Sequence, residues 1–258
     1  MSKLRVTSIQ SVLHWENESA NLSMFEEKLA ALKGQTDLVV LPEMFNSGFS
    51  MTPKAIAQAA DGATIGWMCR QAEKLEAAIC GSLAVLFEGE YYNQFVFVHP
   101  SGRIDRYNKR HCFRMSGEHE VYRSGSQRVV IDYRGWRILP QVCYDLRFPV
   151  FSRAKNDYDL MIYVANWPQA RRAPWRCLLQ ARAIENQSYV VGVNRIGEDA
   201  NGIAYSGDSL SIDYLGEISF DSAAASVSDT QTLHLDRLAS YRKKFPAWMD
   251  ADDFELNS

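Results

Sequence analysis

The stretch Gly135-Trp-Arg-Ile-Leu-Pro-Gln-Val-Cys143-Tyr-Asp-Leu-Arg-Phe-Pro149 carries a hydrophobic segment that ends on a thiol. Residues 136–142 have the character of a β-strand, and a polar turn with a helix start follows directly. A side chain at such a corner is exposed at the top of a sheet, where backbone N–H groups can favour a thiolate and stabilise an oxyanion. The pattern predicts that Cys143 is a nucleophile presented by an α/β fold.

Two further segments supply groups that a cysteine nucleophile needs. Residues 38–43, Leu-Val-Val-Leu-Pro-Glu, end a short apolar strand on Glu43, and residues 107–113 contain Lys109. Glu43 could accept the thiol proton and return it to a leaving amine, while Lys109 could stabilise the oxyanion and lower the pKa of Cys143. Each residue alone has an ordinary explanation, as a buried thiol, a turn carboxylate or a surface amine. Together they indicate acyl transfer from an amide or a nitrile.

The bulk composition is that of an ordinary globular enzyme. The chain has 258 residues, of which 47% are hydrophobic and 23% charged, and its net charge of −3 gives no reason to expect nucleic acid or an anionic membrane as a partner. Five cysteines without a C-x-x-C pair argue against a disulfide framework and against a structural metal site. With no apparent signal peptide or apolar membrane segment, the expected location is the cytoplasm. No metal and no cofactor is expected.

Strands and helices alternate along the whole chain. Strands are predicted at residues 4–10, 37–41, 78–87, 91–99, 103–107, 127–133, 136–142, 159–165 and 188–194, with further short strands up to about residue 235. Helices are predicted at residues 17–33, 64–77, 149 to about 156, 174–186 and 236–244. Residues 111–126 have weak periodicity and are expected to form a long ordered loop.

No linker or repeat divides the chain. We therefore expect a single domain over residues 1–258, with a C-terminal tail from about residue 236 that includes the apolar stretch 245–249. Helices outside two sheets would give an α-β-β-α sandwich, an α/β architecture.

Several of these segments, in this order, resemble the nitrilase or carbon-nitrogen hydrolase superfamily. The matching segments are Leu41-Pro-Glu43-Met-Phe45, Tyr107-Asn-Lys109-Arg-His111, Gly117-Glu118, residues 143–149, Ala165-Asn-Trp167 and residues 181–190. The resemblance runs from residue 4 to about residue 235. It implies the same sandwich and a Glu-Lys-Cys triad that hydrolyses amides through a thioester.

The resemblance also implies roles for individual residues. Glu43 would be the general base, Lys109 the oxyanion stabiliser and Cys143 the nucleophile, with the backbone N–H of Tyr144 completing the oxyanion hole. Glu118 matches a second family glutamate, which orients the lysine and the substrate amide. Many relatives carry an acidic residue where this chain has Val150. That difference concerns local packing or a subunit contact and leaves the triad intact.

Within the superfamily, the chain is similar to the omega-amidases, which hydrolyse the terminal amide of 2-oxoglutaramate and 2-oxosuccinamate. Such substrates are anionic, and an arginine can bind their distal carboxylate through two hydrogen bonds. Arg171 and Arg172 are candidates for this contact. The remaining candidates for substrate contact are Phe45, Phe49, Asn166 and Trp167, of which Phe45 and Phe49 could instead belong to the core.

Other functions remain open at this point. The chain could act on another small linear amide, or be a non-enzymatic scaffold with the same fold. A papain-like Cys-His enzyme is disfavoured because no histidine shows a partner pattern, and His111 is better explained as flanking Lys109. An N-acyltransferase would be expected to carry membrane spans. The apolar side chains of Phe148, Val150, Phe151 and Trp248 predict a homodimer or a higher even oligomer.

Overall fold

The computed structural model describes residues 2–256, in which most strands belong to two large sheets. The first sheet has the order β15-β1-β2-β4-β5-β6, with β3 paired to β4. Strands β1, β2 and β4 are parallel, whereas β15, β5 and β6 are antiparallel to their neighbours. Its strands are β1 Lys3–Gln10, β2 Leu38–Val40, β3 Gln58–Ala59, β4 Ala78–Phe87, β5 Glu90–Val98, β6 Ile104–Asn108 and β15 Val227–His234.

The second sheet repeats this plan, with three parallel strands at its centre. Its order is β14-β13-β10-β9-β8-β7, in which β8, β9 and β10 are parallel. Its strands are β7 Ile131–Tyr133, β8 Trp136–Val142, β9 Leu160–Ala165, β10 Tyr189–Asn194, β13 Leu210–Ile212 and β14 Ile218–Asp221. A separate two-stranded hairpin is formed by β11 Ile196–Glu198 and β12 Ala204–Ser206.

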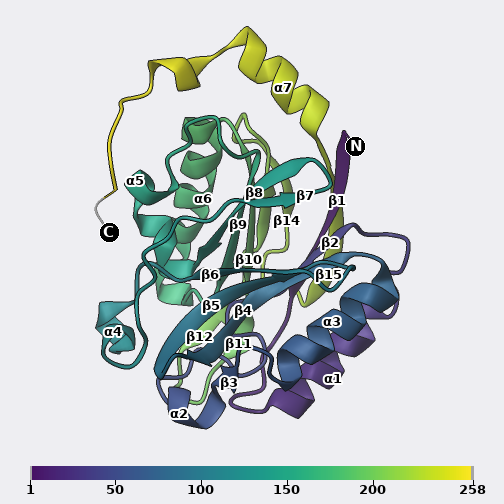
Figure 1. Ribbon diagram of the computed structural model, residues 1–258, viewed down its shortest axis with the longest axis vertical. Coiled ribbons are helices and arrows are strands. Elements are labelled where there is room, and N and C mark those ends of the chain that lie inside the picture. The colour runs from purple at the N-terminus through teal and green to yellow at the C-terminus, as the bar shows by residue number, and fades with distance from the viewer. Residues whose placement is uncertain (1, 257–258) are drawn as a thin grey trace.

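The longer helices α1 and α3 cover the outer face of the first sheet, and α6 covers the outer face of the second (Figure 1). The α-helices are α1 Glu18–Leu29, α2 Pro53–Ile56, α3 Ala63–Leu75, α4 Glu118–Val121, α5 Pro149–Ser152, α6 Arg172–Asn186 and α7 Leu235–Lys244. Short 3-10 turns are η1 Arg114–Ser116, η2 Cys143–Arg147, η3 Gln169–Arg171 and η4 Ala247–Asp250. None of the described helices is long and apolar enough to cross a bilayer.

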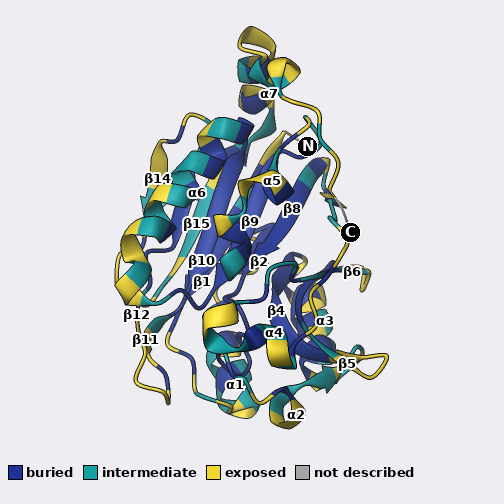
Figure 2. Ribbon diagram, turned by 90° about the vertical axis from the view of Figure 1, so that its left-hand side faces the viewer, coloured by how far each residue is buried: buried dark blue, intermediate teal, exposed yellow. Residues whose placement is uncertain are grey.

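The four layers arise because each central strand packs against the other sheet with one face and against helices with its other face. In β2, Leu38 and Val40 pack toward the second sheet, whereas Val39 packs with residues of α1 and α3. In β9, Met161 and Tyr163 likewise pack against α6. The central strands are therefore buried on both sides, as Figure 2 shows. This arrangement confirms the predicted α-β-β-α sandwich.

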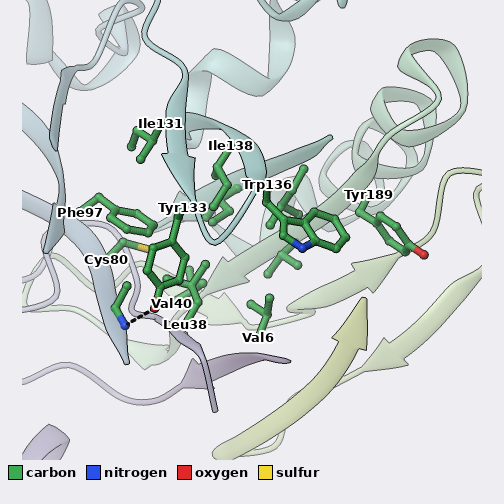
Figure 3. Packing of buried hydrophobic residues seen from close by; sticks show 14 of the residues in the cluster. Val6, Leu38, Val40, Cys80, Phe97, Ile131, Tyr133, Trp136, Ile138 and Tyr189 are labelled. Atoms are coloured by element: carbon green, nitrogen blue, oxygen red, sulfur yellow. Dashed lines mark hydrogen bonds between the residues drawn. The ribbon is translucent and has the colours of Figure 1, made fainter. Parts of the chain in front are cut away.

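The inner faces of the two sheets share one apolar core, drawn in Figure 3. Trp136 and Tyr133 reach into it from the β7–β8 hairpin. The Tyr133 hydroxyl donates to the backbone oxygen of Asp37 at 2.8 Å and accepts from the backbone N–H of Ala78 at 3.2 Å. Arg134, in the same hairpin, binds the Asp37 carboxylate at 3.0 Å. The hairpin therefore fixes the second sheet against the ends of two strands of the first.

Some predicted element boundaries are wrong. Residues 111–126 are not free of secondary structure, because they contain η1 and α4. Helix α1 ends at Leu29 and not near residue 33. The helix that begins at Pro149 ends at Ser152, because the chain turns away so that Ala154 donates its backbone N–H to Asn186 Oδ1 at 2.8 Å.

Candidate active site

Three residues of the predicted site follow the ends of parallel strands. Cys143 comes directly after β8, Asn166 directly after β9, and Glu43 shortly after β2 in the other sheet. The carboxyl ends of parallel strands share one edge of a sheet, and ligands in α/β folds commonly bind there. Here the edges of both sheets meet, because the Asn166 backbone N–H donates to Glu43 Oε2 at 2.8 Å. The Asn166 side chain also donates to the Glu43 carbonyl at 2.6 Å.

A buried cluster of three charges forms the centre of the site. The Lys109 ammonium contacts Glu43 Oε1 at 2.9 Å and both carboxylate oxygens of Glu118 at 2.9 Å. All three side chains are at most 1% exposed. The Asn93 amide nitrogen donates to Glu43 Oε1 at 2.8 Å and to Glu118 Oε1 at 3.1 Å. Two carboxylates therefore share one ammonium and one amide.

These contacts keep Lys109 positively charged. Burial by itself lowers the pKa of Lys109, but the negative charges of Glu118 and Glu43 outweigh it and raise the pKa well above its ordinary value. Burial raises the pKa of Glu118, with a smaller contribution from Glu43 that is opposed by Lys109. Lys109 is thus available as a permanent cation beside Glu118, a carboxylate whose ionised form burial disfavours.

Cys143 occupies a strained turn beside this cluster. Its φ of 45° lies in the left-handed region, which is uncommon for a residue other than glycine and recurs at functional sites. Burial raises the pKa of the Cys143 thiol well above its usual range, and the charges of Glu43 and Glu118 add to the rise. Lys109 lowers this pKa, as the sequence predicted, but it does not reverse the total. The resting group is therefore a thiol, which needs a base to become a nucleophile.

The turn that carries Cys143 is held by a buried carboxylate. Asp145 accepts from the backbone N–H of Val142 at 2.9 Å and from the Tyr107 hydroxyl at 2.8 Å. It also accepts from the backbone N–H of His111 at 3.0 Å and contacts His111 Nδ1 at 2.7 Å. Asp145 thereby joins the nucleophile turn of the second sheet to the Lys109 strand of the first. His111 belongs to this support and is more than a neighbour of Lys109 in the sequence.

The site opens into a pocket of about 720 Å³. Cys143 and Lys109 line it together with the predicted Tyr144, Asn166 and Trp167. Phe49 also lines it, with its ring centroid 5.2 Å from the Lys109 nitrogen. The other lining residues are Trp15, Glu16, Ser50, Met51, Thr52, Phe113, Met115, Ser116, Arg147, Pro168, Ala170, Arg171, Asp199, Asn201, Ile203 and Tyr205.

Phe45 is a core residue and not a pocket wall. It is fully buried, packs edge to face on Phe25 with ring centroids 5.6 Å apart, and contacts Trp67. The sequence left both interpretations open, since an aromatic residue after Glu43 could face either way. The structure places it under the first sheet, in the layer formed by α1 and α3.

The two arginines predicted to bind a carboxylate behave differently. Arg171 lines the pocket, with its guanidinium 5.4 Å from the centroid of the Phe113 ring. Arg172 is absent from the lining and forms a two-pronged ion pair with Asp208 at 2.8 and 2.7 Å. At the start of α6, the Arg172 side chain is thus engaged by an internal partner and does not face the pocket.

Arg147, which the sequence interpretation did not consider, also lines the pocket. It is exposed and lies 5.2 Å from the centroid of the Trp167 ring. Among the described residues, neither Arg147 nor Arg171 has a carboxylate within ion-pair distance. The pocket therefore presents two guanidinium groups that an anionic ligand can reach.

The sequence interpretation missed Asn93, Asp145 and Arg147. Asp145 and Arg147 lie within the quoted nucleophile segment, so their proximity to Cys143 was visible although their direction was not. No distinct signal in the sequence marked Asn93, which is one of three polar residues, with Glu90 and Gln94, in an aromatic and apolar strand. Among residues 2–256, no group of three His, Cys, Asp or Glu side chains is arranged to hold a metal ion.

The sequence profile of the carbon-nitrogen hydrolase family matches residues 5–243 of this chain. The protein therefore belongs to the carbon-nitrogen hydrolase family and is a hydrolase of carbon–nitrogen bonds. Omega-amidase YafV of Escherichia coli is 49% identical to it over 99% of this chain and 100% of the relative. A 2-oxoglutaramate amidase of Bacillus subtilis is 27% identical over 96% of this chain and 97% of the relative.

A solved structure shows the same fold at high similarity. A protein of the same superfamily from Xanthomonas campestris, with an arsenic adduct in its active site, has a TM-score of 0.96 and 43% identity over 100% of both chains. The likeness covers every layer of the sandwich, so the fold and the family assignment agree.

Proposed function

We propose that the protein is an omega-amidase, which hydrolyses the terminal amide of a short 2-oxo dicarboxylic acid monoamide such as 2-oxoglutaramate or 2-oxosuccinamate. The observation that carries this proposal is that Cys143 and Lys109 line one pocket with Arg147 and Arg171, while Glu43 and Glu118 bind Lys109 from behind it. The similarity to omega-amidase YafV over nearly the whole chain supports the same activity.

The chemistry begins with a proton transfer from the thiol to Glu43. The raised pKa of Cys143 means that the sulfur attacks the amide carbon only as Glu43 removes its proton. The resulting oxyanion accepts hydrogen bonds from Lys109 and from the backbone N–H of Tyr144. A shared bond to Glu118 and one bond to Glu43 occupy two of the three ammonium N–H groups, so one remains for the oxyanion.

Glu43 then returns the proton to the nitrogen, and ammonia leaves as the carbon–nitrogen bond breaks. The acyl group remains on Cys143 as a thioester. Glu43 takes a proton from a water molecule, which attacks the thioester and releases the 2-oxo dicarboxylate and the thiol. Glu118 keeps Lys109 in place throughout, by the contacts to both of its carboxylate oxygens.

The charges of the pocket favour an anionic substrate. Arg147 and Arg171 supply hydrogen-bond donors for the distal carboxylate. Two carboxylates also line the pocket, and both accept hydrogen bonds from neighbouring hydroxyls: Glu16 from Ser50 and Thr52, and Asp199 from Tyr205. We therefore expect 2-oxo acid amides to be preferred over glutamine and asparagine, whose ammonium group would lie near Lys109 and the arginines.

The test is ammonia release from 2-oxoglutaramate, 2-oxosuccinamate, glutamine, asparagine and a simple nitrile, with Cys143→Ala as the inactive control. Arg147→Leu and Arg171→Leu should each raise the KM for the 2-oxo acid amides about 10–100-fold, the usual worth of one charged hydrogen bond. Arg172→Leu is the matched control, because its partner is Asp208, and should leave KM near the wild-type value. Equal kcat/KM for glutamine and 2-oxoglutaramate would contradict the charge argument.

One observation favours a second candidate, an amidase for a longer linear amide. A pocket of about 720 Å³ falls in the size range that holds drug-sized ligands, well above the need of a short 2-oxo acid amide. A higher kcat/KM for an amide extended at its acyl end than for 2-oxoglutaramate would favour this candidate.

We also propose that the protein acts in the cytoplasm as a homodimer or a higher even oligomer. Val150, Phe245 and Met249 are 56%, 56% and 66% exposed, and Phe148 and Trp248 are partly exposed. Phe151, which the sequence interpretation placed on the same surface, is instead buried in the core.

A further inference from the structure

Asn93 contacts three of the four proposed catalytic residues. Its side-chain nitrogen donates to Glu43 Oε1 at 2.8 Å and to Glu118 Oε1 at 3.1 Å. Its backbone oxygen accepts from the Lys109 backbone N–H at 2.9 Å. The residue lies in the middle of β5 and is 1% exposed. It therefore touches the loop after β2, the end of β6 and the start of α4, which must meet for the site to form.

The orientation of the Asn93 amide is fixed by what surrounds it. A side-chain amide has two N–H donors on one end and an acceptor oxygen on the other. Both donors point to carboxylates, and the reverse orientation would set its oxygen against Glu43 and Glu118. In the adopted orientation Oδ1 is buried and has no partner among the described atoms. An unpaired buried acceptor is unfavourable, so the contacts to the two glutamates must outweigh it.

The two N–H donors of Asn93 are needed because the charges of the cluster do not balance. Glu43 and Glu118 are both buried, and Lys109 supplies one positive charge for the two of them. When both are ionised, the cluster carries a net negative charge in a site from which water is largely excluded. Neutral N–H donors stabilise an ionised carboxylate without adding a further charge, and a further charge would displace Lys109 or Cys143.

We propose that Asn93 is a positioning residue, whose amide holds the carboxylates of Glu43 and Glu118 ionised on either side of Lys109. It does not line the substrate pocket and acts through the two glutamates. This inference rests on the proposed roles of Glu43, Lys109 and Cys143. Without the amide, one of the two glutamates retains a proton at higher pH, and the enzyme loses either its base or the anchor of its lysine.

The test is the pH dependence of kcat/KM for ammonia release in Asn93→Leu and Asn93→Thr. Leucine keeps the approximate volume of the side chain but has no donor, whereas threonine suits a β-strand and retains one donor. The acidic limb of the profile should move up by about one pH unit in Asn93→Leu and by less in Asn93→Thr. Because Asn93 does not contact the substrate, kcat should fall while KM changes little.

Asn186→Leu provides the matched control, because Asn186 is another buried asparagine, whose amide bonds the backbone of α6 and of the chain after α5. It should lower the melting temperature and leave the acidic limb in place. The proposal would be overturned if the acidic limbs of the pH profile coincided for wild type and both Asn93 variants. An equal shift of the limb in Asn186→Leu would also overturn it, and so would failure of both Asn93 variants to fold. Glu43→Gln is measured in parallel: retained hydrolysis there would refute the triad itself, whereas an inactive Glu43→Gln with unmoved Asn93 limbs refutes only the role of Asn93.

Discussion

At the scale of single residues, the reactivity of Cys143 is set by opposing influences. Burial, Glu43 and Glu118 raise the pKa of its thiol, and Lys109 lowers it. A thiolate is the reactive form toward alkylating reagents, so the alkylation rate measures this balance directly. In the proposed mechanism, hydrolysis in contrast needs Glu43 and Lys109 together. The two reactions therefore respond differently to the same substitutions.

We predict that Glu43→Gln and Lys109→Met both lower hydrolysis by about 100-fold or more but change alkylation of Cys143 in opposite directions. Removing the charge of Glu43 lowers the pKa of Cys143, so iodoacetamide should react faster near neutral pH. Removing Lys109 raises this pKa further and should slow the reaction. Mass spectrometry of the Cys143 peptide gives the rates, with the exposed Cys177 as an internal reference. Changes in the same direction would contradict the assigned charges.

The sequence indicated Glu43, Lys109, Glu118 and Cys143 as candidate catalytic residues because each lies in a short segment with a recognisable pattern. It could not separate Arg172 from Arg147, since the direction of each side chain depends on turns that spacing does not reveal. Asn93 was missed for a different reason. Its importance comes from strand pairing, which brings β5 beside the end of β6, and from a buried carboxylate in α4.

At the scale of secondary-structure elements, Asp37 connects the start of β2 to strand β1 and to the β7–β8 hairpin of the second sheet. Its carboxylate accepts from the Arg5 backbone at 2.9 Å and side chain at 3.0 Å, and binds Arg134 of the β7–β8 hairpin at 3.0 Å. Burial would raise the pKa of Asp37, but the bonds to Arg5 and the charge of Arg134 lower it below its ordinary value. The ionised carboxylate is thus part of the contact between sheets.

We predict that Asp37→Asn lowers the free energy of unfolding at pH 7 by about 1–3 kcal/mol, the cost of unpairing a largely buried charged contact. The stabilisation is present above the unfolded pKa of about 3.9 and is lost as the pH falls through the lower folded pKa. The difference between wild type and variant should therefore shrink at the most acidic pH. Urea titrations at several pH values measure it. Glu76→Gln, which breaks the exposed pair with Lys33, is the control and should change stability little.

Element boundaries were predicted less well than element types. The strands and longer helices appear close to where hydrophobic periodicity placed them, because burial on one or both faces determines that pattern. The short helices η1 and α4 were missed because they are set by tertiary contacts, including the bonds from Asn93 to Glu118 and from the Tyr122 hydroxyl to the Ser50 carbonyl. Periodicity over four residues is too short to reveal such an element.

At the scale of the whole molecule, we predict an even oligomer in solution. The exposed side chains of Val150, Phe245 and Met249 gather on α5 and the C-terminal segment, where a second copy could cover them. Light scattering at micromolar concentration should give at least twice the monomer mass of 29.3 kDa. Val150→Glu should reduce that mass if α5 contributes to the interface, whereas Leu86→Glu, at an exposed site in β4, should not. A monomeric wild-type mass would contradict the prediction.

The division of the site between two sheets has a consequence for how the chain behaves before it is fully folded. Glu43, Lys109 and Glu118 belong to the half that leaves the ribosome first, and Cys143 belongs to the half that follows. In a chain whose sheets have not yet joined, the sulfur is solvated, has its ordinary acidity and meets no base. It can then be alkylated or oxidised but cannot cleave an amide. Assembly of the two sheets therefore replaces general reactivity of the thiol with selective cleavage of the amide substrate. The ratio of thiol labelling to ammonia release would report the fraction of molecules in which the two halves are still apart.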